Sequence, residues 1–152
     1  MSLHTALVKI EEEKISSEKA KSFIISKKNG AESIFVGRVR NENDGKKVTG
    51  VTYDAHDQAV IKSFQSICND AKNKFDKNAK IFLEHAKGYV PVGEISILIA
   101  VGAGHRDEAF KICRYILEEV KHQSPIWKKE HYTGGKEEWL PGHSLRSQEK
   151  IK

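Results

Sequence analysis

The chain has 152 residues, enough for one domain that buries its own core. Lys and Arg outnumber Asp and Glu by 26 to 21, which gives a net charge of +5 and an isoelectric point of about 9.1. This basic excess favours anionic partners without choosing between a phosphate ester, an acidic protein and nucleic acid. The longest apolar run, residues 95–101, is too short to span a bilayer, and the polar N-terminus has no signal-peptide core. We therefore expect a cytoplasmic protein with no membrane segment.

The first half of the chain predicts strands and helices in alternation. A serine caps the first helix and Asn29-Gly30 ends it, while Asp44-Gly45 forms a turn between two strands. Asp57 is expected to cap the second helix, whose apolar residues recur at steps of three and four. The expected elements are a strand at 6–10, a helix from 16 or 17 to 25, a buried strand at 34–39, a strand at 48–53 and a helix from 57 to about 75.

The second half predicts two strands, a helix and a hairpin. Gly88 and Gly93 separate the strands, and Gly134-Gly135 turns the hairpin. The expected elements are strands at 80–86 and 94–101, a helix at 107–123 and a hairpin at 130–139, with a frayed tail at 144–152. The apolar residues of this helix recur at steps of three and four and predict one buried stripe of Ala109, Phe110, Ile112, Cys113, Ile116, Leu117 and Val120. No repeat, low-complexity tract or linker divides the sequence. We therefore predict a single α+β domain over residues 1–152, with mixed strands and two main helices.

The predicted helix at 107–123 has cationic residues around both of its ends. They are His105 and Arg106 at the start, Lys121 and His122 at the end, and Lys128 and Lys129 beyond it. Pro125 stops the helix, and the turn that follows allows Lys128 to come back toward Lys121. This arrangement suits an anionic substrate. For a lone lysine at a helix C-terminus, however, the helix dipole is a sufficient explanation.

Other features of the sequence could mark a site of a different kind. Gly102-Ala103-Gly104 is either an anion-binding turn or a flexible entry into the helix, and it lacks the full G-x-G-x-x-G pattern of a dinucleotide site. Cys68 and Cys113 lie on apolar helix stripes, so we expect reduced core residues. The seven histidines are scattered, with no C-x-x-C or H-E-x-x-H motif, and no metal or other cofactor is expected.

Three separated segments carry the most specific pattern in the chain. They are IFVGRVRNENDGKKVTGVTYDAH at 34–56, GYVPVGEISILIAVGAGHR at 88–106, and HRDEAF followed by Lys121 and SPIWKKE at 105–130. Together they resemble the large subunit of molybdopterin synthase, the MoaE family, with a similarity that extends over residues 30–143. Three motifs in the family's order are much more specific than any one of them.

The resemblance implies an α/β-hammerhead fold, assembled as a homodimer at the core of a heterotetramer. The implied partner is a small ubiquitin-like, MoaD-like sulfur-carrier subunit whose C-terminal Gly-Gly ends in a thiocarboxylate. The implied reaction transfers sulfur to cyclic pyranopterin monophosphate and makes the molybdopterin dithiolene, a step of molybdenum cofactor biosynthesis. Because the partner brings the nucleophilic sulfur, a sulfurtransferase of this kind need only position its substrates, move protons and neutralise charge.

Two lysines match the catalytic lysines of the family. From the resemblance, Lys128 is expected to contact the thiocarboxylate or the reacting substrate oxygen. Lys121 is expected to assist as an acid, a base or an electrostatic stabiliser. These roles agree with the absence of an evident Cys or Ser nucleophile.

The resemblance also implies substrate-binding residues. Arg40 matches an arginine that binds substrate or the partner carboxylate through its planar guanidinium group. His105 and Arg106 match a pair expected to hold the phosphate, in a site shared across the dimer, and Phe35 is expected to shape the pocket wall. His143 stands where the family pattern has an arginine, so a positive charge there would depend on pH.

Two other interpretations stay open. The lysine pairs and the high isoelectric point would suit a non-catalytic basic module that binds nucleic acid or an acidic protein tail. Aromatic residues are few, however, and no RNA-binding or helix-turn-helix signature occurs. The chain could instead keep the fold and partner binding without activity, although Arg40, Lys121 and Lys128 are all in place.

Overall fold

A computed structural model describes residues 1–140, which form three helices and eight strands. The helices are α1 (Ser17–Ile24), α2 (Asp57–Phe75) and α3 (Arg106–Gln123). The strands are β1 (Leu3–Lys9), β2 (Ala31–Arg38), β3 (Glu42–Asn43), β4 (Lys46–Ala55), β5 (Lys80–Pro91), β6 (Ile95–Ala103), β7 (Ile126–Tyr132) and β8 (Glu137–Trp139). The predicted α+β class with two main helices is confirmed, whereas the predicted tail at 144–152 lies outside the described residues. No helix within residues 1–140 combines the length and the apolar content that crossing a bilayer requires.

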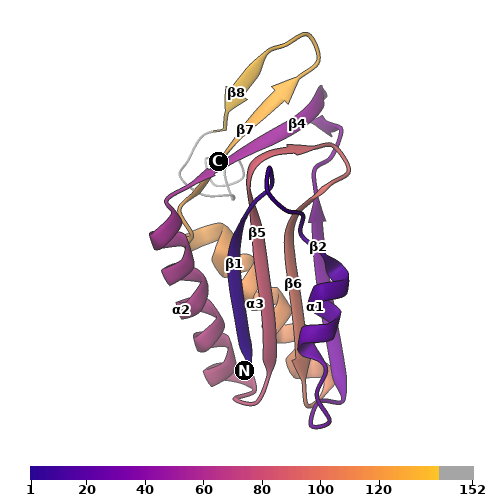
Figure 1. The fold of residues 1–152 in the computed structure, drawn as a ribbon, viewed down its shortest axis with the longest axis vertical. Coiled ribbons are helices and arrows are strands. Elements are labelled where there is room, and N and C mark those ends of the chain that lie inside the picture. Colours follow the sequence, from indigo (N-terminus) through magenta and orange to yellow (C-terminus); the bar gives the residue numbers. More distant parts are fainter. Residues whose placement is uncertain (141–152) are drawn as a thin grey trace.

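The strands form one sheet with two halves. Its order is β2-β6-β5-β4-β7-β8, and β1 and β3 are added beside β5 and β4. β1 runs parallel to β5, and the other pairings within residues 1–140 are antiparallel, so the strands are mixed as predicted. β5 joins the halves, because Lys80–His85 pairs with β6 and Gly88–Pro91 pairs with β4. In Figure 1, β4, β7 and β8 cross above β1, β5, β6 and β2.

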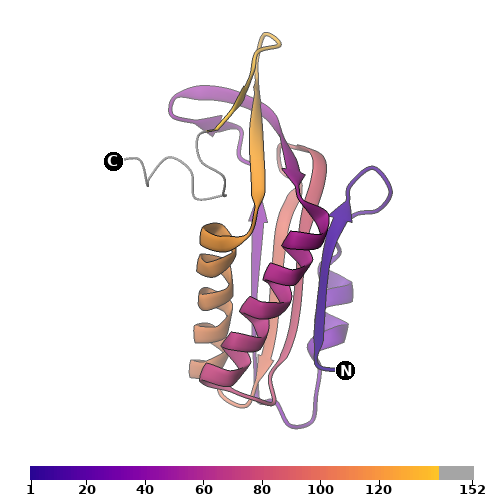
Figure 2. The same cartoon turned by 90° about the vertical axis from the view of Figure 1, so that its left-hand side faces the viewer.

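The helices cover the lower half of the sheet from several sides (Figures 1 and 2). α3 packs against β2 and β6 on one face, α1 packs against β5 and β6 on the other, and α2 lies beside β1 and α3. β6 therefore runs between two layers of helix, and its residues from Ser96 to Ala103 are all buried. The apolar run in the sequence corresponds to this central strand.

The two long helices bury the residues that the sequence period predicts. In α2 these residues are Val60, Phe64, Ile67, Cys68 and Ala71. In α3 they are Ala109, Ile112, Cys113, Ile116 and Val120. Both cysteines are free thiols in the core, as predicted. Phe110 differs from the prediction, because its side chain is 64% exposed although the pattern placed it on the buried stripe.

The N-terminus of α2 differs from the prediction. His56, and not Asp57, is the N-cap, since its Nδ1 accepts a hydrogen bond from the amide of Ala59 at 3.4 Å. Asp57 is the first residue of the helix, and its carboxylate lies 2.5 Å from the Nζ of Lys87. Asp57 therefore forms a tertiary ion pair with Lys87 and does not have the capping role that local preferences predict for it.

Two further local predictions need correction. Ser16 caps α1 as expected, but the helix ends at Ile24 because the backbone of Ile25 is extended, well before Asn29-Gly30. Strand β2 was expected to be buried. It lies at an edge of the sheet, and its residues alternate between partly buried and exposed over much of its length. One side of an edge strand has no neighbouring strand to cover it.

Candidate active site

A small cavity lies where the upper half of the sheet meets the end of β2. It encloses about 90 Å³ between four chain segments. Its lining residues are Arg38, Val39, Arg40, Glu42, Asn43, Val51, Tyr53, Lys128 and Glu130. The cationic side chains here outnumber the carboxylates, so the cavity presents positive charge to an anion.

Strand β7 directs Lys128 toward this cavity and Lys129 away from it. Lys128 lies opposite Tyr53 of β4, and Glu130 shares its face because side chains alternate along a strand. The Nζ of Lys129 lies 3.0 Å from a carboxylate oxygen of Glu137 and 5.0 Å from the ring centre of Trp139. The side chains of Lys128 and Lys129 therefore lie on opposite faces of β7.

A β-bulge places the arginines. The register between β2 and β6 shifts between Gly37 and Arg38, and a bulge of this kind changes the direction of the side chains that follow. The Nη1 of Arg38 donates to the carbonyl of Gly93 at 2.7 Å, and backbone hydrogen bonds also join Val39 to this turn. Arg40 comes next, with an exposed side chain at the cavity. The backbone around Arg40 is thus fixed while its guanidinium group remains accessible.

Glu130 is a buried carboxylate in the cavity wall that sequence reasoning missed. Both of its oxygens accept from the Nδ2 of Asn43 at 3.0 Å, and one accepts from the hydroxyl of Tyr132 at 2.8 Å. Burial and this carboxylate raise the pKa of Tyr132, so its phenol stays a donor. These bonds hold β3 against β7. In the sequence, a glutamate directly after two lysines is typical of a solvated surface. The strand whose alternation buries Glu130 was not predicted to include the residues before it.

His85 lies under the same region and is 1% exposed. Its Nδ1 donates to the carbonyl of Ala86 at 2.8 Å, and its ring meets the ring of Tyr53 edge-on at 4.9 Å between centroids. Burial lowers the pKa of His85 from 6.5 to about 4, and the positive charge of Lys128 acts in the same direction. At neutral pH this imidazole is therefore uncharged.

We predict that His85 makes the fold sensitive to acid. The unfolded chain takes up a proton near pH 6.5 and the folded chain only near pH 4, so the free energy of unfolding falls as the pH drops between these values. The loss amounts to about 3 kcal/mol at most. Denaturant titrations from about pH 7 to about pH 4.5 should show a shallower fall for His85→Phe than for the wild type. Equal slopes for the two proteins would contradict this prediction.

The other predicted cationic residues lie at the two ends of α3. Lys121 is half-buried in the last turn, whereas His105 and Arg106 are exposed at the first. A helix rises 1.5 Å per residue, so these ends are separated by about 25 Å. One copy of the chain therefore does not bring His105 and Arg106 to the cavity that holds Lys128 and Arg40.

The turn before α3 already has an anionic partner from its own chain. The amide of Gly104 donates to the Oδ2 of Asp76 at 2.9 Å, just beyond the end of α2. Asp76 thus takes one backbone donor that an external phosphate would use. Binding of an anion at this end of α3 would depend mainly on the side chains of His105 and Arg106.

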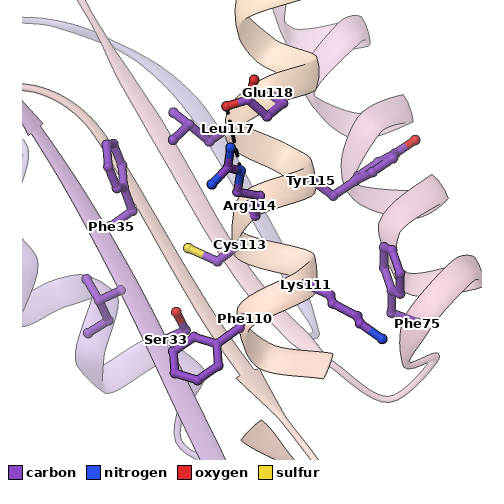
Figure 3. A pocket seen from close by; sticks show the side chains of 11 residues that line it. Ser33, Phe35, Phe75, Phe110, Lys111, Cys113, Arg114, Tyr115, Leu117 and Glu118 are labelled. Atoms are coloured by element: carbon purple, nitrogen blue, oxygen red, sulfur yellow. Dashed lines mark ion pairs between the residues drawn. The ribbon is translucent and has the colours of Figure 1, made fainter. Parts of the chain in front are cut away.

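A wide groove runs over the outer face of α3. It encloses about 950 Å³ and is lined mainly by apolar side chains of β2, α2 and α3, including Phe35. Figure 3 shows Ser33 and Phe35 on one flank of α3 and Phe75 on the other, with the α3 side chains between them. Its most exposed large apolar side chain is Phe110, and Arg114 and Glu118 form an ion pair across one helical turn at 3.9 Å. Phe35 therefore belongs to this groove and not to the wall of the small cavity.

Comparison with known proteins places the chain in a family. The family model described as "MoaE protein" matches residues 10–123. The chain belongs to the MoaE family. It is 45% identical to the molybdopterin synthase catalytic subunit of Synechococcus elongatus over 116 residues, which cover 76% of this chain and 70% of that protein. It is 39% identical to the protein of the same name from Pyrococcus abyssi over 130 residues, 86% of either chain.

Solved structures of MoaE-type proteins share the fold. Molybdopterin synthase from Staphylococcus aureus superposes with a TM-score of 0.82 at 27% identity, covering 93% of this chain and 98% of that one. A chain from the Helicobacter pylori complex of subunits 1 and 2 of molybdopterin-converting factor gives a TM-score of 0.67 at 23% identity, covering 95% and 93%. The predicted family and fold are thereby confirmed.

The predicted cationic site residues that lie within the described part of this MoaE-family chain fall into three groups. Lys128 and Arg40 line one cavity, Lys121 lies at the end of α3 that leads into β7, and His105 with Arg106 lies at the far end. His143 lies outside the described residues. Within residues 1–140, no group of three or more His, Cys, Asp or Glu side chains is arranged to hold a metal ion.

Proposed function

We propose that this chain is the catalytic subunit of a molybdopterin synthase, a sulfurtransferase of molybdenum cofactor biosynthesis. It would transfer sulfur from the C-terminal thiocarboxylate of a small ubiquitin-like subunit to cyclic pyranopterin monophosphate. The observation that carries the proposal is the cavity in which Lys128 and Arg40 converge, in a chain 45% identical to a molybdopterin synthase catalytic subunit. Both reactants are anions, and the cationic side chains suit them.

The chemistry of the cavity agrees with a sulfur atom that arrives on a partner. The chain has two cysteines, and both are buried in the core and absent from the cavity lining. Burial raises the pKa of Cys68 to about 12, and it also raises the pKa of Cys113, so neither is a ready thiolate. The chain's own contribution is then to hold the two anions together and to stabilise charge as the carbon–sulfur bond forms. Lys128 has this role, assisted by Lys121.

The groove on α3 suits a second copy of the same chain. Lys111 and Glu118 are seven residues apart and lie on one face of the helix. In a two-fold arrangement with antiparallel helices, Lys111 of each copy would lie opposite Glu118 of the other, and the Phe110 side chains would enter the partner's groove. This self-complementary pattern of charge and apolar surface supports a homodimer.

The same two-fold arrangement would complete the site. Antiparallel α3 helices bring the start of one beside the end of the other, so His105 and Arg106 would approach Lys121 of the second copy. His105 and Arg106 lie about 25 Å from the other end of α3 in their own chain. In the dimer, each site would therefore take this phosphate-binding pair from the opposite protomer. Arg40 and Lys128 would come from one chain, and His105 with Arg106 from the other.

A small subunit would dock on each copy of the dimer and give a heterotetramer. Support comes from the Helicobacter pylori protein of the same fold, which was solved as a complex of subunits 1 and 2 of molybdopterin-converting factor. A glycine-rich C-terminal tail has no bulky side chains, so it suits a cavity as narrow as the one beside Lys128.

The basic-module interpretation has less support. Two of the lysines that suggested it already have carboxylate partners, since Lys46 lies 3.5 Å from Glu138 and Lys129 lies 3.0 Å from Glu137. Such pairs are typical of an ordinary solvated surface with mixed charge.

A single-turnover assay tests the function. The protein is mixed with a thiocarboxylated small subunit and cyclic pyranopterin monophosphate, and the dithiolene product is measured. The control is the same small subunit with an ordinary C-terminal carboxylate, which should give no product. If folded protein binds the small subunit but makes no product, the chain is an inactive scaffold. If it does not bind the small subunit either, the basic module becomes the better interpretation.

A further inference from the structure

The side chain of Asn43 is held in one orientation at the wall of the small cavity. Its Nδ2 donates to both carboxylate oxygens of Glu130, each at 3.0 Å. A carboxylate only accepts hydrogen bonds, and the amide group of asparagine has its donor on the nitrogen and its acceptor on the oxygen. The reversed amide would bring its oxygen against the carboxylate, acceptor to acceptor. The nitrogen of Asn43 therefore faces Glu130.

Glu130 and the backbone around Asn43 are both fixed. Glu130 is 4% exposed, and its Oε1 also accepts from the hydroxyl of Tyr132 at 2.8 Å. Asn43 directly precedes the tight turn between β3 and β4, where Asp44 and Gly45 have φ angles of 51° and 77°. The amide of Asn43 is thus preorganised before any ligand arrives.

Asn43 supplies the cavity with an uncharged hydrogen-bond acceptor. Within residues 1–140, the side-chain hydrogen bonds of Asn43 use Nδ2 and leave Oδ1 available. Arg40 and Lys128 line the same cavity, and their side chains carry donors only. The carboxylate of Glu130 is already bonded to Asn43 and Tyr132. The Oδ1 of Asn43 can therefore accept from an N–H group without repelling an anion nearby.

A peptide tail with an anionic end has the matching chemistry. Its terminus suits Arg40 and Lys128, and each of its residues brings a backbone N–H into a cavity of about 90 Å³. A buried N–H without an acceptor is costly, so the tail needs an acceptor at a fixed place. Glycine has no side chain to keep its backbone away from the wall. A ring N–H of the pterin offers the same kind of donor, but the narrow cavity favours the tail.

We infer that Asn43, oriented by Glu130, binds a backbone N–H of the partner's C-terminal tail through its Oδ1. The inference rests on the proposed function, in which this tail enters the cavity, and it adds a residue that recognises the backbone of the tail. Asn43 contributes binding and moves no proton at the reacting atoms. We therefore expect an effect on affinity for the small subunit, with no change in the KM for the pterin or in the rate at saturating small subunit.

Binding titrations with two forms of the small subunit test the inference. One form ends in Gly-Gly with an ordinary carboxylate, and the other lacks these two residues. Asn43→Ala should weaken binding of the complete form by about 5- to 10-fold, the effect of one hydrogen bond, and leave binding of the truncated form unchanged. Asn41→Ala is the matched control. Asn41 is exposed and absent from the cavity lining, and alanine retains its backbone carbonyl, which accepts from the amide of Val48 at 2.9 Å.

Glu130→Gln tests the orientation of the amide. The new side chain carries an NH₂ group that donates to the Oδ1 of Asn43 in competition with the tail, so affinity for the complete form should fall. Once Asn43 is replaced by alanine, Glu130→Gln should have no further effect on this affinity. Thermal unfolding shows whether each variant is folded. Asn43→Ser keeps a hydroxyl donor for Glu130 and takes the place of Asn43→Ala if that variant does not fold.

The outcomes separate the inference from the proposed function. An equal loss of affinity for both forms would reveal a structural effect and overturn the inference, and so would unchanged affinity for both. A raised KM for the pterin with unchanged affinity for the tail would assign the N–H to the substrate and also overturn it. In each of these cases the wild type still makes product. Absence of product from the wild type would instead refute the proposed function, and the inference with it.

Discussion

Lys128→Ala is expected to lower single-turnover sulfur transfer by about 10²- to 10³-fold while leaving the protein folded. Lys128 lines the cavity together with Arg40, and alanine removes the cationic group of the residue that lies opposite Tyr53 on the neighbouring strand. Charge that develops as sulfur bonds to the substrate would then have no ammonium partner in the cavity. The rate is measured with saturating small subunit, so that a loss of partner affinity does not appear as a loss of chemistry.

Lys129→Ala is the matched control for this experiment. It removes the same side chain one residue away, on the opposite face of β7, where Lys129 pairs with Glu137. An exposed ion pair of this kind contributes little to stability, so the variant should retain nearly all of its activity. If the two alanine variants had similar rates, the catalytic role of Lys128 would be excluded. Lys128→Arg is expected to recover part of the rate, because it keeps the charge but changes the geometry of the donor.

Mixing two inactive variants is expected to restore activity. Arg106→Ala and Lys128→Ala should each be nearly inactive as homodimers, because every site lacks one group. In a mixed dimer, one site carries both substitutions and the other carries neither. Random exchange of protomers should therefore return about a quarter of the wild-type activity. The readout is product formation after the two proteins have been unfolded together and refolded.

The mixing experiment has a clear negative outcome. If His105 and Arg106 worked within their own chain, no mixed dimer would contain an intact site, and no activity would return. Phe110→Asp in both variants is a further control. It places a charge in the apolar groove of α3, so dimers should not form and activity should not recover. Sedimentation or light scattering of each mixture shows whether dimers are present.

The local parts of the fold were the parts that sequence could predict. The steps of three and four in α3 and the two glycines of the last hairpin correspond to the observed elements. Errors occurred where tertiary contacts replaced a local preference, as at Asp57, which pairs with Lys87 instead of capping α2. Phe110 was placed in the core because periodicity detects an apolar face without showing what covers it.

The candidate site depends even more on tertiary contacts, which local sequence patterns do not detect. Lys128 and Arg40 were identified through a resemblance, and the structure brings them to one cavity. Tyr53 and Glu130 were missed as site residues because their position depends on the pairing of β4 with β7, between residues far apart in the chain. No local pattern specifies such a pairing. The predicted hairpin also began at 130, which left Lys128 outside any strand and hid the alternation that separates it from Lys129.

The long-range strand pairing also determines when the site can exist during synthesis. β1 pairs with β5, β2 with β6, and β4 with β7, so each pairing must close a loop of many residues. Proteins with such distant contacts fold slowly, because the entropy of loop closure is lost before the contact is gained. The cavity takes side chains from Arg38 to Glu130, so a growing chain cannot form it until most of the sequence has left the ribosome. Until then the apolar strand β6 has no complete cover, and this interval is when the protein is most prone to aggregate.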